Sequence, residues 1–72
     1  MTRVRKRSVS IRGHRTSFSV EDEFMAELER LAGARGVPLA VLVAEVDETR
    51  DRAVNLSSAL RLHVLAALKA PV

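Results

Sequence analysis

A period-two alternation of apolar and polar residues over positions 8–20 restricts the fold more than any other feature of this sequence. Apolar or β-branched residues occupy odd positions before Gly13 and even positions after it. They are Val9 and Ile11 in the first stretch, and Thr16, Phe18 and Val20 in the second. Alternation is typical of a β-strand with one buried face, but a single straight strand would place these two sets on opposite faces. The glycine therefore marks a turn or a kink.

Two interpretations fit this change of phase. In the first, Gly13 and His14 form a two-residue hairpin turn, because glycine accepts the positive φ that such turns need. The serines then share one face and the apolar residues the other, although Arg12 faces Arg15, which is unfavourable for two like charges. In the second, only residues 15–20 form a strand, with a kink before it. Residues 1–7 lack periodicity and are expected to be a flexible basic arm.

The rest of the chain shows helical spacing and predicts a mainly α domain, residues 8–72, with a short N-terminal β segment. The expected helices span residues 21–34, 38–50 and 56–69. The acids at 21–23 offset the dipole at the start of the first helix. Pro38 suits the first turn of the second helix, and Asn55 or Ser57 is expected to cap the third.

The length of the chain limits how stable a single hydrophobic core can be. At 72 residues it is one domain, close to the size at which a single core needs support from disulfides, metals or association. It has no cysteine, and its two histidines, His14 and His63, lie far apart. Disulfides and thiolate metal sites are thereby excluded. We expect self-association, and no metal or cofactor.

Charge is distributed unevenly along the sequence. The first 20 residues hold six bases and no acid, a charge of +6, whereas the remainder holds six bases and nine acids, a charge of −3. A basic block beside an acidic body indicates a polyanionic partner, most commonly nucleic acid. No secretory signal or apolar run of about 20 residues occurs, so we expect a cytoplasmic, nucleoid-associated protein without a membrane partner.

The order of elements leads to a family resemblance. A basic strand, a helix with an acidic start, the turn "ARGVPLA" and an apolar helix resemble, over residues 15–47, the ribbon-helix-helix DNA-binding proteins of the Arc, MetJ and CopG class. The stretches "RSVSIRGHRTSFSVEDEF" and "NLSSALRLHVL" are similar to two signatures of a short single-domain subfamily with an extra C-terminal helix. The resemblance implies an intertwined homodimer whose two chains share an antiparallel β-ribbon that enters the DNA major groove.

The resemblance also implies site residues. The family's three base-reading positions fall on Arg15, Ser17 and Ser19. Its phosphate-binding helix start falls on the amides of Leu39 and Ala40, where free N–H groups favour an anion. These strand positions have a simpler interpretation as the solvent face of an amphipathic strand.

Further phosphate contacts are expected from the basic residues near the N-terminus. They are Arg3, Arg5, Lys6 and Arg7 in the arm and Arg12 at the turn. Such contacts add salt-dependent affinity but little sequence information. The alternative for the arm is a tail without a ligand.

These observations favour a homodimeric transcriptional regulator that binds double-stranded DNA in a sequence-specific manner. Catalysis is not expected, because neither a nucleophile elbow nor a glycine-rich phosphate loop is present, and no catalytic residue is assigned. The alternative function is a protein-interaction module, an antitoxin or adaptor, whose apolar helix over residues 56–69 binds another protein.

A hairpin within one chain complicates the DNA interpretation. Two hairpins paired in a dimer would form a four-stranded sheet, which is wider than the ribbon a major groove normally accepts. Either the outer strands detach on DNA, or the sheet binds DNA differently, or its polar face binds a protein.

Overall fold

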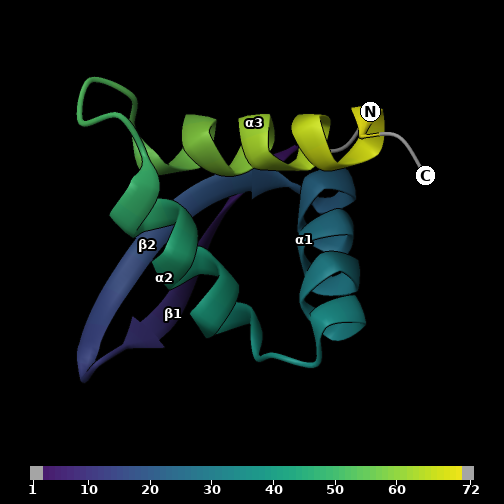
Figure 1. Cartoon of the computed structure of the whole chain (residues 1–72). Coiled ribbons are helices and arrows are strands. Elements are labelled where there is room, and N and C mark those ends of the chain that lie inside the picture. Colours follow the sequence, from purple (N-terminus) through teal and green to yellow (C-terminus); the bar gives the residue numbers. More distant parts are fainter. Residues whose placement is uncertain (1–2, 71–72) are drawn as a thin grey trace.

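The computed structural model describes residues 3–70 as a β-hairpin followed by three helices (Figure 1). The elements are β1 (Val4–Ile11), β2 (His14–Glu21), α1 (Asp22–Arg35), α2 (Leu39–Thr49) and α3 (Leu56–Lys69). The fold is mostly helical with an N-terminal hairpin. Each helix lies within one residue of the bounds expected from its spacing and capping residues.

The hairpin turn differs from the expected one. It is formed by Arg12 and Gly13, with φ values of 51° and 81°, and it pairs Ile11 with His14. Of the two-residue turns that match the twist of the strands, type I′ has positive φ at both central residues, and here Arg12 and Gly13 supply them. The expected Gly13–His14 turn, and with it the pairing of Arg12 with Arg15, was wrong. Because the register moves by two residues, each side chain keeps its face.

The first strand is longer than the alternation indicated. β1 begins at Val4, so residues 4–7 are extended backbone and not part of a flexible arm, while Met1 and Thr2 lie outside the described residues. The cause is a contact distant in sequence. Arg5 and Arg7 both reach the carboxylate of Asp22 at the start of α1, at 3.3 and 2.5 Å, and hold this part of β1 in place.

The helix ends follow local chemistry. α1 ends at Gly36, where φ is 68° and the amide donates to the carbonyl of Gly33. α2 begins after Pro38, whose carbonyl accepts the amides of the first turn. The side chain of Asn55 accepts a hydrogen bond from the Ser58 amide at 2.8 Å, so Asn55 caps α3.

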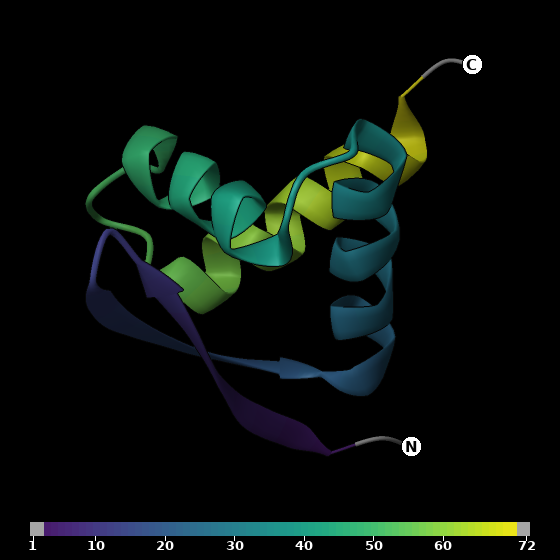
Figure 2. The same cartoon turned by 90° about the horizontal axis from the view of Figure 1, so that it is seen from below.

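One hydrophobic core lies between the hairpin and the helices. The three helices cover the same face of the hairpin and leave its other face open (Figure 2). The core residues are Phe18 and Val20 from β2, Leu28 and Ala32 from α1, Leu42, Val43 and Val46 from α2, and Leu56, Ala59, Leu60 and Val64 from α3. Since α3 contributes four of them, the third helix is an integral part of the domain.

Not every apolar side chain of α3 lies in the core. Leu62, Leu65 and Leu68 are 56%, 50% and 60% exposed.

None of the helices in the described part of the chain is long and apolar enough to cross a membrane.

Candidate nucleic-acid interface

The face of the hairpin opposite the helices is polar and basic. Alternation along both strands places the same kinds of residue there: Lys6, Ser8 and Ser10 from β1, and Arg15, Ser17 and Ser19 from β2. We call these six residues the outer face. Its side chains pair across the strands, and the hydroxyl oxygens of the central pair, Ser8 and Ser17, lie 3.5 Å apart. The outer face thus presents small hydrogen-bonding groups with one cation near each end.

The three expected base-reading residues all lie on this face. Arg15 and Ser17 are exposed, whereas Ser19 is half-buried. Within residues 3–70 neither Arg15 nor Lys6 pairs with a carboxylate, so neither cation has to break an ion pair before it binds an anion or a base edge.

Sequence reasoning did not assign Ser8 and Ser10 to the site, and it assigned Lys6 to phosphate alone. The signal that would have found them is a short repeat of the form cation-x-Ser-x-Ser. It occurs as "KRSVS" at residues 6–10 and as "RTSFS" at residues 15–19.

The expected phosphate-binding residues are not all brought to one surface. Arg3 is exposed just before β1, and Arg12 at the turn forms an exposed ion pair with Glu48 at 2.8 Å. Exposed pairs of this kind are weak, so Arg12 can exchange Glu48 for a phosphate at little cost.

Arg5 and Arg7 lie on the opposite face from Lys6, because they pair with Val20 and Phe18 across the strands. The Arg7 side chain is only 16% exposed, and its hydrogen bond to Asp22 lowers the pKa of that carboxyl. Arg5 is 63% exposed and adds to the same effect. Both arginines therefore have a role in joining β1 to α1.

The start of α2 lies on the helical side of the hairpin. Leu39 and Ala40 are its first two residues, and amides at such positions have no carbonyl partner within the helix. Both residues are half-buried, and Ala40 lines a hollow beside Ile11 of the hairpin that also contains Glu45. The phosphate role of these amides stays a prediction, as do the roles of the basic residues.

At Ser19, the free edge of β2 is bonded to side chains of α3. The amide of Ser19 donates to the hydroxyl of Ser57 at 2.8 Å, and its carbonyl accepts from the guanidinium of Arg61 at 3.1 Å. Arg61 also bonds the carboxylate of Glu21 at 3.1 Å. The pKa of Glu21 is lowered, mainly by a backbone hydrogen bond and further by Arg61. Sequence reasoning gave no such role to Ser57 or Arg61.

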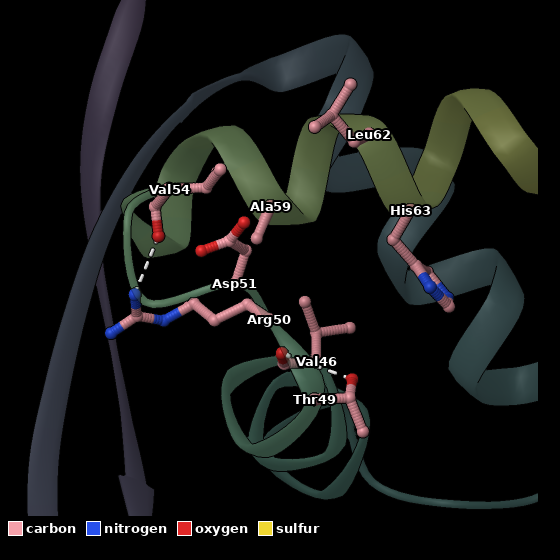
Figure 3. Close-up of a pocket in the computed structure, with 8 residues that line it drawn as sticks. All are labelled: Val46, Thr49, Arg50, Asp51, Val54, Ala59, Leu62 and His63. Carbon is pink, nitrogen blue, oxygen red and sulfur yellow. Dashed lines mark hydrogen bonds between the residues drawn. The ribbon is translucent and has the colours of Figure 1, made fainter.

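A separate pocket of about 310 Å³ lies between α2, the following loop and α3 (Figure 3). Its charged residues hold the loop: Arg50 donates to the carbonyl of Val54 at 2.6 Å and to the Asp47 carboxylate at 2.8 Å. Figure 3 shows Arg50 reaching towards Val54. Among the described residues there is no cluster of three or more His, Cys, Asp or Glu that would hold a metal ion. The polar contacts of this pocket are thus explained by the loop.

Comparison with known families agrees with this architecture. The family model of the ribbon-helix-helix domain matches residues 4–68, so the chain belongs to the ribbon-helix-helix family. This is a non-enzymatic family of DNA-binding regulators and antitoxins. Neither the curated proteins nor the solved structures that were compared gave a match to the chain.

Proposed function

We propose that this protein binds double-stranded DNA in a sequence-specific manner and acts as a homodimeric transcriptional regulator at the nucleoid in the cytoplasm. The observation that carries the proposal is the outer face of the hairpin. It combines four serine hydroxyls with two cations that have no carboxylate partner within residues 3–70, on a sheet backed by the core. Family membership supports DNA binding, typically by a dimer.

The dimensions and chemistry of the outer face suit the major groove. Neighbouring strands are about 4.8 Å apart, and the groove is about 12 Å wide, so a two-stranded ribbon enters with its side chains against the base edges. The guanidinium of Arg15 matches the two acceptors of guanine. A hydroxyl such as that of Ser17 can donate or accept a hydrogen bond, so it can bind a base edge that presents either an acceptor or a donor.

Phosphate contacts would position the ribbon in the groove. Arg3 and Arg12 are the best placed for this, since both are exposed near the ends of β1. Lys6, Arg5 and the amides at the start of α2 can add to them, whereas Arg7 would have to leave Asp22. Each neutralised phosphate releases counterions, so affinity should fall steeply as salt rises.

Selection of bound duplexes from a random DNA pool, run at two salt concentrations, tests the proposal. We expect a preferred motif at both, and lower affinity at the higher salt. Arg15→Ala should weaken binding to the preferred motif by about 1–3 kcal/mol and relax the preference at one position. Arg30→Ala removes the same charge from the surface of α1, where Arg30 pairs with Glu27, and is the matched control. No enrichment, or affinity that is insensitive to salt, would refute DNA binding.

The alternative is a protein-interaction module, an antitoxin or adaptor, and the exposed leucines of α3 favour it. Leu62, Leu65 and Leu68 form an apolar surface on the side of α3 away from the core. Large exposed apolar patches commonly mark contacts with proteins. If the protein purifies from its own cells only as a homodimer, and enriches a DNA motif, this alternative loses its support.

A further inference from the structure

We propose that a second copy of the chain packs against α3, with its own α3 antiparallel to the first. The contact joins the exposed leucines of α3, which are Leu62, Leu65 and Leu68 and which we call the leucine face, to the pocket between α2 and α3. It is a contact between helices and is separate from any pairing of strands. The inference rests on the homodimer of the proposed function and not on DNA binding.

Most of the large apolar side chains that are exposed lie on α3, at one edge of the molecule (Figure 1). Five such side chains are exposed within residues 3–70, and three of them form the leucine face. Interfaces of homodimers are more apolar than the rest of a protein surface. A chain of 72 residues also gains stability from association. Of the described surface, the leucine face is therefore the part best suited to a second copy.

The leucine face continues into the pocket. Each leucine follows the previous one by three residues, a spacing that makes neighbours on the surface of a helix. Leu62 also lines the pocket, together with Ala59 one turn before it. Along its own direction α3 thus presents first a recess and then the projecting side chains of Leu65 and Leu68.

The recess is already formed in the single chain (Figure 3). Arg50 holds the loop that closes one side of it by donating to the carbonyl of Val54 at 2.6 Å. The hydroxyl of Thr49 donates to the carbonyl of Glu45 at 3.0 Å. Because these polar groups have partners, the recess suits an apolar side chain.

The two parts of this surface fit each other. A twofold dimer joins the same surface of both chains, so a projection on one copy has to meet a recess on the other. When two α3 helices run antiparallel with Leu65 near the axis, Leu68 of each copy lies level with Leu62 of the other, beside the recess. The volume of the recess is about 310 Å³. An apolar cavity of about 150 Å³ already holds benzene, so a leucine side chain fits here.

The charges of α3 are compatible with this arrangement. Residues Leu56–Lys69 include no carboxylate, so two copies of the helix bring only basic side chains together. Arg61 would lie level with Lys69 of the other copy. It is paired with Glu21 at 3.1 Å, and this pair is neutral as a whole. Lys69 therefore meets an ion pair and not an unpaired cation.

Sedimentation of two Leu65 variants tests the contact. Leu65→Ser removes an apolar side chain that is exposed in the single chain, so the fold of that chain is spared, which circular dichroism checks. We expect the dissociation constant of the dimer to rise at least about tenfold. Leu65→Met keeps an apolar side chain of similar size and should leave the constant nearly unchanged.

Crosslinking tests the antiparallel arrangement, because the natural chain has no cysteine. A short bismaleimide should join two copies of Leu65→Cys, whose cysteines lie near the axis. Ala26→Cys, exposed on α1, is the control and should link far more slowly.

The outcomes separate this inference from the proposed function. If Leu65→Ser leaves the dissociation constant of a dimer unchanged, or if Leu65→Cys links no faster than Ala26→Cys, the inference fails and the homodimer stands. If the natural protein stays monomeric at all concentrations, the homodimer fails and the inference with it. A different protein that binds the leucine face in place of the second copy would also overturn the inference, and would favour the interaction module.

Discussion

At the scale of single residues, Ser57 and Arg61 decide how the hairpin meets the third helix. A backbone amide and carbonyl at a sheet edge are normally satisfied by a neighbouring strand or by water. Here the two groups of Ser19 are satisfied by side chains of α3. Arg61 also lies over the ring of Phe24, 5.8 Å from its centroid, and so joins the hairpin, α1 and α3 at one point.

Ser57→Ala should lower the free energy of unfolding, because it leaves the Ser19 amide without its acceptor in a half-buried position. The net value of such a hydrogen bond is about 1 kcal/mol. Urea denaturation measures it, and Ser58→Ala is the matched control in the same helical turn, since Ser58 is held through its backbone amide. Equal unfolding midpoints for the two variants would contradict the role of Ser57.

At the scale of elements, the turn sets the register of the outer face. Arg12 and Gly13 both have positive φ, a conformation that costs an ordinary residue energy and costs glycine little. Since the faces alternate along each strand, a turn displaced by one residue would reverse the face of every following side chain.

Gly13→Ala should therefore destabilise the protein, by about 1–2 kcal/mol, because φ at this position is 81°. Gly33→Ala should have the opposite effect, since Gly33 lies inside α1 with open space around it and alanine favours helix by about 0.5–1 kcal/mol. Thermal unfolding followed by circular dichroism measures whether the stability of each variant falls or rises. A stabilised Gly13→Ala would mean that the turn is not the one described.

The elements also show what the sequence could and could not predict. Helix bounds were predictable because their signals are local, as with Pro38 before α2 and Asn55 before α3. The turn was misplaced because Gly13 can be either the first or the second central residue of a two-residue turn. Nothing in the sequence indicates that Arg12 adopts a positive φ. The early start of β1 was missed because it depends on Asp22, which lies far along the chain. The contacts of α3 with Ser19 are equally non-local.

At the scale of the whole molecule, the hairpin and the helices form two layers that differ in charge. The outer face of the hairpin carries two cations that have no carboxylate partner among the described residues, and the helical layer carries most of the acids. Several acids of the helical layer are already neutralised locally; Glu45, for example, forms two hydrogen bonds to Arg35, which lower its pKa. An acidic layer behind a basic one favours approach to DNA by the hairpin side.

The same layering predicts that α3 is needed for folding of the single chain. Leu60→Ala should lower the free energy of unfolding by about 2–5 kcal/mol, because Leu60 is fully buried in the core cluster that also contains residues of β2 and α2. Leu62→Ala, on the exposed side of the same helix, should change it by no more than about 0.5 kcal/mol. Chemical denaturation of the two variants is the measurement, and similar losses for both would show that α3 is not packed as described.

The two-residue link between β1 and β2 has a consequence for how the protein behaves when it is scarce. A sheet shared by separate molecules disappears on dilution, because its stability depends on protomer concentration. Strands joined by Arg12 and Gly13 meet in a first-order step that takes microseconds in isolated hairpins. The pairing of β1 with β2 therefore needs no encounter between two protomers.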